Sequence, residues 1–254
     1  MSVSERVSHR VDVAVPPASS ARWAEELERG NILFFPRMPF QLLDEDRAFL
    51  LEQKQTQAGY HKNIAYRPAE GRLTGAGKMP AQDAARLTAR NDLAHVDAFP
   101  TRPTHGDRIL RVFVNLNPAE DRVWITSETF EGLAERFARQ VGIPKAAGGA
   151  QVFGKMARAL GIRQWSRSPY DAFMLRFHDF LKENAEFQRD CTKQHWEFPP
   201  GSCWICYTDM VSHAVLSGRF ALEQTFLISR QAMALPEKSP IRILERICGH
   251  PLAN

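Results

Sequence analysis

Apolar and polar residues alternate most regularly between positions 108 and 116, which predicts a β-strand. One face of this strand is apolar and comprises Leu110, Val112, Val114 and Leu116. The other face is polar and aromatic and comprises Arg111, Phe113 and Asn115. Two such faces suit the wall of a barrel whose inner side lines a pocket. An edge sheet with one solvated face is the alternative interpretation.

The residues before this strand divide into short elements separated by proline and glycine. We expect a polar arm over residues 1–18, a helix over 19–30 that ends at Gly30, and a buried strand over 32–35 that ends at Pro36. Apolar spacing predicts further helices over 42–55 and 81–91. Residues 57–78 are rich in glycine and are expected to be irregular.

The residues after this strand are first mostly helical and then mostly extended. Residues 128–190 form a predicted helical insert, in which Ser168 and Pro169 are a typical helix start. Phe173, Phe177 and Phe180 recur on the following helix and are expected to pack against the sheet. Strands are predicted between 193 and 229, and a last helix begins at Ser239-Pro240 and ends at Gly249.

This interleaving predicts an α+β fold, a double-stranded β-helix (jelly-roll) core flanked by helices. Residues 19–254 would form a single domain. A doubly wound sheet is disfavoured, since the sequence contains neither a glycine-rich dinucleotide fingerprint nor a phosphate loop.

Composition narrows the class of function. The 254 residues are 44% hydrophobic and 24% charged, with a net charge of +4. This mild excess of positive charge fits either an ordinary solvated surface or attraction to an anionic substrate or membrane face. No dense basic block points to nucleic acid. The charged N-terminus lacks the apolar core of a signal peptide, so we expect a cytoplasmic protein.

Two cysteines, Cys203 and Cys206, have the spacing of a redox or zinc motif. They fall inside an apolar strand-like run, where residues three apart point to opposite faces. No second cysteine pair is present to complete a zinc site. We therefore interpret both as buried thiols.

The tripeptide His95-Val96-Asp97 carries the strongest chemical signal. If residues 94–99 form a strand, His95 and Asp97 project from the same face. His213 begins a late predicted strand, after turn residues that include Asp209, and would supply a third ligand. Two imidazoles and one carboxylate leave half of an octahedral iron(II) ion open for cosubstrate and oxygen. A histidine beside an ordinary aspartate is the alternative when the tripeptide is taken alone.

Several longer stretches resemble the Kdo hydroxylases, which act on 3-deoxy-D-manno-oct-2-ulosonic acid in bacterial lipopolysaccharide. They are His61-Lys-Asn-Ile64, His95-Val-Asp-Ala-Phe-Pro100, Gly106-Asp-Arg-Ile-Leu-Arg-Val-Phe113, Asn115-Leu-Asn-Pro118, Tyr170-Asp-Ala-Phe-Met-Leu-Arg176, and the stretch from Trp204 through His213 to Phe226. The similarity covers most of residues 33–250. The resemblance implies a double-stranded β-helix and an Fe(II)- and 2-oxoglutarate-dependent hydroxylase with His95, Asp97 and His213 as metal ligands. Its substrates would be molecular oxygen and a Kdo-bearing lipid A precursor, which would be converted to its 3-hydroxylated form.

The sequence departs from many 2-oxoglutarate oxygenases at the cosubstrate site. Such enzymes hold the distal carboxylate with an arginine about ten residues past the second histidine, where this chain has Glu223. Arg111 or Arg219 could instead supply the bidentate contact, with Asn115 nearby on the face of Arg111. Candidate contacts to the sugar acid lie in predicted loops: Arg102, Lys62, Asn63 and Arg67. His105 and His195 receive no site role.

Two other functions remain open. The same three ligands could act on another acidic molecule or a protein side chain, or the chain could be a carbohydrate- or membrane-binding β-sandwich without metal chemistry. A lipid substrate would require contact with the inner membrane, and mild basicity without an anchor predicts weak, salt-sensitive attachment to its cytoplasmic face. The sequence is compatible with either a monomer or a homo-oligomer.

Overall fold

The computed structural model describes residues 20–38, 44–45, 48, 63–67, 72–77, 87, 90–100, 102–144 and 167–252. The predicted arm over 1–18, most of the predicted helices over 42–55 and 81–91, and the middle of the helical insert lie outside these residues.

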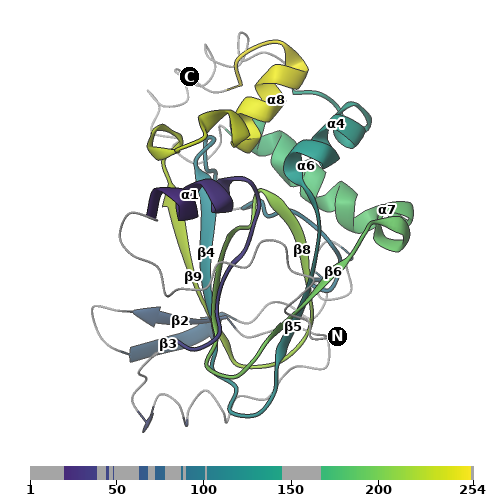
Figure 1. The fold of residues 1–254 in the computed structure, drawn as a ribbon. Helices are drawn as coiled ribbons and strands as arrows, with labels where there is room; N and C mark the ends of the chain where they lie inside the picture. Colours follow the sequence, from purple (N-terminus) through teal and green to yellow (C-terminus); the bar gives the residue numbers. More distant parts are fainter. Residues whose placement is uncertain are drawn as a thin grey trace.

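Two antiparallel sheets form the centre of the molecule (Figure 1). The first has the order β1 (Leu33–Phe35), β7 (Cys203–Tyr207), β4 (Arg108–Asn115) and β9 (Ala221–Ile228). The second has the order β6 (Gln194–Phe198), β5 (Arg122–Thr129) and β8 (Val211–Ser217). The chain changes sheet at every step from β4 to β5 and from β6 through β9. Such alternation between facing sheets is a jelly roll, so the predicted fold class is confirmed.

The space between the sheets is filled by stacked aromatic rings. Trp204 lies at the centre, with its ring centroid 4.0 Å from that of Phe198 and 5.2 Å from that of Phe113. The remaining members of this inner core are Ile32, Phe34, Trp124, Trp196 and Cys206. Phe113 belongs to the polar and aromatic face of β4, so this face points inward, as the barrel-wall interpretation predicts.

Helices cover the outer face and one end of the sandwich (Figure 1). They are α1 (Ser20–Glu28), α4 (Phe130–Val141), α6 (Pro169–Glu183), α7 (Ala185–Asp190) and α8 (Pro240–Cys248), with the 3₁₀ turns η4 (Arg230–Ala232) and η5 (Pro236–Lys238). The predicted start of α6 is confirmed, because the Asp171 backbone N–H donates to Ser168 Oγ over 3.0 Å. The left-handed Gly249, with φ of 75°, ends α8 as predicted. Within the described residues, no helix combines the length and the apolar character needed to cross a membrane.

Two parts of the chain differ from the sequence-based expectation. Residues 57–78 include a hairpin of β2 (Asn63–Arg67) and β3 (Arg72–Gly77), where we expected irregular structure. The two strands pair with each other across a short connection, which compensates for their low intrinsic strand propensity. Strand β5 was also not predicted, although Trp124 is buried in the inner core. The second half of β5, Thr126–Thr129, is polar on both faces, so the sequence shows no clear alternation of apolar and polar residues.

Candidate metal centre

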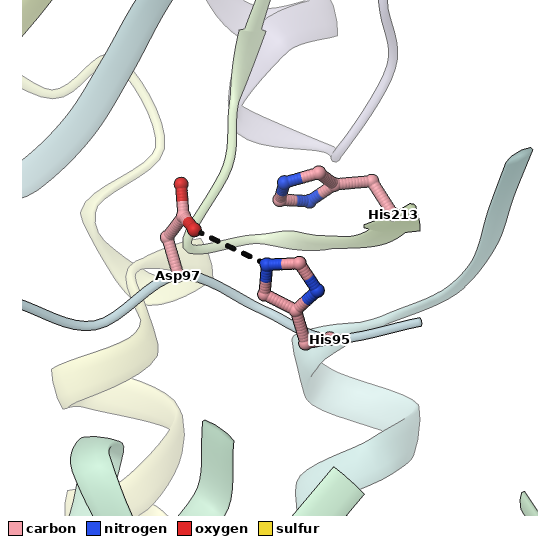
Figure 2. Close-up of side chains that lie close together, drawn as sticks. All are labelled: His95, Asp97 and His213. Carbon is pink, nitrogen blue, oxygen red and sulfur yellow. Dashed lines mark ion pairs between the residues drawn. The ribbon is translucent and has the colours of Figure 1, made fainter. Parts of the chain in front are cut away.

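The segment before Asp97 runs beside β8 without forming a regular strand. His95 and His213 exchange two backbone hydrogen bonds, with N–O distances of 3.1 and 2.9 Å, and they form an isolated bridge. The Asp97 N–H instead donates to the Thr208 carbonyl over 2.8 Å. The predicted strand over 94–99 is therefore wrong, because the turn after β7 replaces β8 as the backbone partner. The chain stays extended enough for His95 and Asp97 to face the same way (Figure 2).

The side chains of His95, Asp97 and His213 converge on one point (Figure 2). Each offers one ligand atom, and these atoms all lie within 4.8 Å of one another. His95 Nε2 is 3.6 Å from Asp97 Oδ1. All three side chains are buried. Two imidazoles and one carboxylate are the donor set of non-haem iron(II) sites, and metal bonds of about 2 Å would draw these atoms closer together.

In both histidines, the hydrogen bond made by Nδ1 fixes the tautomer in which Nε2 is free to bind a metal. His95 Nδ1 lies 2.7 Å from the Leu93 carbonyl oxygen, and His213 Nδ1 lies 3.0 Å from the Val211 carbonyl oxygen. A carbonyl only accepts, so each Nδ1 carries the hydrogen and donates. Each Nε2 then keeps its lone pair for the ion, which is the usual arrangement around metal-binding histidines.

Burial and charge also favour the metal-binding protonation states. Burial lowers the pKa of His95 to about 3, against the opposing effect of Asp97. Burial likewise lowers the pKa of His213. Burial alone would raise the pKa of Asp97, but Arg111 and the two histidines hold it well below its usual value. The three ligands are thus deprotonated at neutral pH, as metal binding requires.

These shifts predict acid sensitivity of the metal-free protein. Histidines in the unfolded chain gain a proton below about pH 6.5, whereas His95 and His213 stay neutral when folded. Each then costs up to about 1.4 kcal/mol of unfolding free energy per pH unit between about pH 6.5 and the lowered folded pKa. Asp97 adds nothing between about pH 6.5 and 4, because it remains ionised in both states there, and it adds to the loss of stability only below its unfolded pKa of about 4.

Urea denaturation of metal-free protein at pH 7 and pH 5 measures this loss. His95→Gln removes one of the two histidines and should reduce the difference between the two pH values. A protein that is equally stable at both, or more stable at pH 5, would contradict the assignment of neutral buried imidazoles.

Arg111 joins the metal cluster to β9. Its Nη2 lies 3.0 Å from Asp97 Oδ2, in an ion pair without hydrogen-bond geometry, and its Nη1 lies 2.8 Å from Glu223 Oε1. Glu223, the residue at which the sequence departs from many 2-oxoglutarate oxygenases, is therefore in contact with Arg111, the predicted cosubstrate residue. The structure brings Arg111 to the cluster and pairs it with two carboxylates at once.

Four buried donors on the inner faces of the sheets have no hydrogen-bond partner. The atoms are Arg111 Nε, Arg122 Nε, Trp124 Nε1 and Trp204 Nε1. All four belong to residues on the inner faces of β4, β5 and β7. Unpaired buried N–H groups are costly, so a donor-lined interior fits an anionic ligand such as a dicarboxylate.

The structure does not bring the other cosubstrate candidates to the cluster. Arg219 is exposed in the turn after β8, with its Nη2 3.0 Å from Glu120 Oε1. Asn115 is fully buried, but its amide donates to the carbonyls of Glu120 and Phe198 over 2.9 and 2.8 Å and thereby closes loops at the far end of β4. Both residues therefore lie outside the cluster and have other partners, and the cosubstrate role predicted for each stays a prediction.

The sugar-acid candidates are only partly described. Arg102 is exposed in the loop before β4. Asn63 and Arg67 are the first and last residues of β2, and the structure describes only their backbone. Lys62 lies outside the described residues. His105 and His195 are both exposed and lie outside the metal cluster.

Two aromatic residues at the cluster escaped the sequence analysis. The Trp124 ring stacks on His213, with centroids 5.3 Å apart and an interplanar angle of 18°. The His178 ring meets His95 edge-on, with centroids 5.0 Å apart. The alternation within 122–126 could have placed Trp124 on an inner face. His178 lies on a helix predicted only to pack, and no local pattern connects it to His95.

A jelly roll that holds two histidines and an aspartate between its sheets is characteristic of non-haem iron oxygenases. A family model for 3-deoxy-D-manno-oct-2-ulosonic acid (Kdo) hydroxylase matches residues 10–89 and 79–251. The chain belongs to the Kdo hydroxylase family.

Solved structures of one relative match over almost the whole chain. The Kdo hydroxylase KdoO, a non-haem Fe(II) α-ketoglutarate-dependent dioxygenase, in complex with cobalt(II) is 30% identical, with a TM-score of 0.77 over 97% of this chain and 98% of that one. KdoO in complex with α-ketoglutarate and Fe(III) is also 30% identical, with a TM-score of 0.76 over 96% of this chain and 97% of that one. Comparison with curated proteins gave no match.

Proposed function

We propose that this protein is an Fe(II)- and 2-oxoglutarate-dependent dioxygenase that hydroxylates Kdo in a lipid A precursor. The convergence of His95, Asp97 and His213 inside a KdoO-like fold carries this conclusion. Family membership and the α-ketoglutarate complex of KdoO support both the cosubstrate and the sugar acid.

The residues of the chain have distinct tasks in this reaction. His95, Asp97 and His213 would hold the ion and would leave coordination positions free for cosubstrate and oxygen. When bound, the iron and 2-oxoglutarate supply the oxidising power for hydroxylation. Trp124 stacks on His213 and packs edge-on against Trp204, so the apolar inner core would shield this side of the site from water. Arg111, the inward-facing cation beside Asp97, is placed to orient the cosubstrate carboxylate.

Arg111 should therefore contribute strongly to the affinity for 2-oxoglutarate. Arg111→Met should weaken 2-oxoglutarate binding to the cobalt-loaded protein by at least about 30-fold, because loss of a buried charge pair costs 2–5 kcal/mol. Glu223→Gln should strengthen binding, since it removes a carboxylate that lies 2.8 Å from Arg111. Isothermal titration of 2-oxoglutarate measures both affinities.

The exposed Arg219→Met is the matched control and should leave cosubstrate affinity unchanged. Weaker binding in Arg219→Met than in Arg111→Met would return the cosubstrate role to Arg219. Weaker binding after Glu223→Gln would mean that Glu223 supports the site.

The function is tested by adding Fe(II) and 2-oxoglutarate anaerobically, then oxygen and a Kdo-bearing glycolipid. We expect succinate and a glycolipid hydroxylated on the sugar acid, in equal amounts. Succinate formed only with other acidic acceptors would indicate a different oxygenase substrate. Protein that binds no metal and forms no succinate would indicate a non-catalytic binding domain.

The cellular location remains part of the proposal. We propose that the lipid-linked substrate brings the protein to the cytoplasmic face of the inner membrane, and the net charge of +4 supports contact with anionic lipid. We expect attachment to anionic vesicles that is lost at high salt, whereas attachment that persists there would require another anchor. Gel filtration at working concentration determines whether the protein is a homo-oligomer.

A further inference from the structure

The side-chain amide of Gln188 holds both backbone groups of Ala94, the residue directly before His95. The Ala94 N–H donates to Gln188 Oε1 over 2.9 Å, and Gln188 Nε2 donates to the Ala94 carbonyl over 2.8 Å. The same Nε2 donates to the Leu181 carbonyl at the end of α6 over 2.7 Å. One amide therefore makes three hydrogen bonds and connects the α6–α7 region to the segment that carries two metal ligands.

The contact between Gln188 and Ala94 takes the place of a neighbouring strand on one side of the His95 segment. His95 turns its N–H and carbonyl toward His213 in β8. Because successive residues of an extended chain direct these groups to opposite sides, those of Ala94 point away from β8. No strand among the described residues pairs with that side, and the Gln188 amide provides one acceptor and one donor in its place.

The helix that carries Gln188 is itself fixed on both sides. The Asn184 side chain caps α7 by accepting from the Phe187 N–H over 3.0 Å. Phe187 is buried in the main hydrophobic core. The Gln188 N–H donates to the Asn184 carbonyl over 3.0 Å. The amide is therefore held by packed structure and can restrain Ala94.

We propose that Gln188 is a positioning residue for the metal centre, and this inference rests on the proposed function. By fixing Ala94, it holds His95 at the place and angle where Nε2 faces Asp97 and His213 (Figure 2). Residues that orient metal ligands without touching the ion commonly change metal affinity by 10- to 100-fold when replaced. Gln188 contacts neither the ion nor the substrate in this assignment, so its effect passes through His95.

Gln188→Met tests the proposal, because methionine has a similar length and no amide. Cobalt(II) should bind this variant about 10- to 100-fold more weakly, with an altered visible spectrum of the bound ion. Gln188→Glu is the second variant. It can accept from the Ala94 N–H but cannot donate to the carbonyls of Ala94 and Leu181, so its cobalt affinity should fall at least as far.

Asn184→Ala is the matched control. It removes the cap of the same short helix but leaves the bonds of Gln188 to Ala94 in place. Thermal melts should show similar stability losses for Asn184→Ala and Gln188→Met, and only the latter should lose cobalt affinity.

Cobalt affinity of both Gln188 variants within twofold of wild type would overturn the positioning role. An equal loss in Asn184→Ala would also overturn it, since the effect would then follow helix stability. Failure of the wild-type protein itself to bind one cobalt ion per chain would instead contradict the proposed function, so the two failures are distinguishable.

Discussion

Replacing His213 with alanine is expected to abolish succinate formation and the binding of one metal ion per chain. Two ligands, His95 and Asp97, would remain, and they come from adjacent points of one extended segment. Loss of a direct ligand should exceed the 10- to 100-fold loss seen when supporting residues are replaced, so we expect more than about 100-fold weaker cobalt binding. Cobalt titration and succinate assays at saturating 2-oxoglutarate measure the two effects.

His195→Ala is the control for His213→Ala. His195 lies on β6 of the same three-stranded sheet, opposite Ile125 on β5, and its side chain is exposed. Its removal should leave metal binding and turnover unchanged. Circular dichroism must show that His213→Ala remains folded, because His213 packs on Trp124. A folded His213→Ala protein that keeps both its metal and its turnover would disprove the ligand assignment.

The parts of the fold that could be predicted are those whose signal is local. Strand β4 has an apolar face and a polar and aromatic face between Leu110 and Asn115, and the last helix has both a proline start and a glycine end. The spacing within the tripeptide from His95 to Asp97 is also local, and it directs both side chains to one face wherever the segment is extended.

The parts that could not be predicted depend on contacts between distant residues. The β2–β3 hairpin is stabilised by pairing that glycine-rich composition conceals. The segment around His95 is extended because β8, the turn at Thr208 and Gln188 each hold one part of it. Gln188 is 94 positions from Ala94, and no periodicity in the sequence relates them.

The same reasoning explains which candidate residues of β4 lie near the cluster. Arg111 shares a strand face with Phe113, so alternation alone directs it inward. Asn115 shares that face as well, but it lies four residues further along β4, about 13 Å away at strand spacing, where the loops close. The alternation of side chains therefore identified the inner face of β4. It did not identify which end of β4 lies near His95, Asp97 and His213.

The metal centre also depends on a turn that a buried ion pair holds in place. Asp209 lies in the turn between β7 and β8, and the neighbouring Thr208 accepts the Asp97 N–H. Arg108 is fully buried, and it meets Asp209 through two hydrogen bonds of 2.9 and 3.2 Å. Its guanidinium also lies 4.2 Å from the centroid of the Tyr207 ring. Geometry of this quality is what a buried pair needs to offset its desolvation.

Asp209→Asn should therefore lower the unfolding free energy by about 3–5 kcal/mol, because it leaves the Arg108 charge buried without its counterion. Urea denaturation of the metal-free protein measures the loss. Asp190→Asn makes the same chemical change in an exposed pair, 2.7 Å from Arg189, and should change stability by less than about 0.5 kcal/mol.

A double variant, Arg108→Met with Asp209→Asn, separates the charge effect from general disruption of the turn. Removing both charges should recover part of the stability lost in Asp209→Asn, since no uncompensated ion then remains in the core. The stability losses of Arg108→Met and Asp209→Asn, each measured alone, give the sum expected for independent residues. If the double variant loses this full sum, the two residues do not act as a pair. The turn at Asp209 would then be held by its backbone contacts, and the position of Asp97 would not depend on this ion pair.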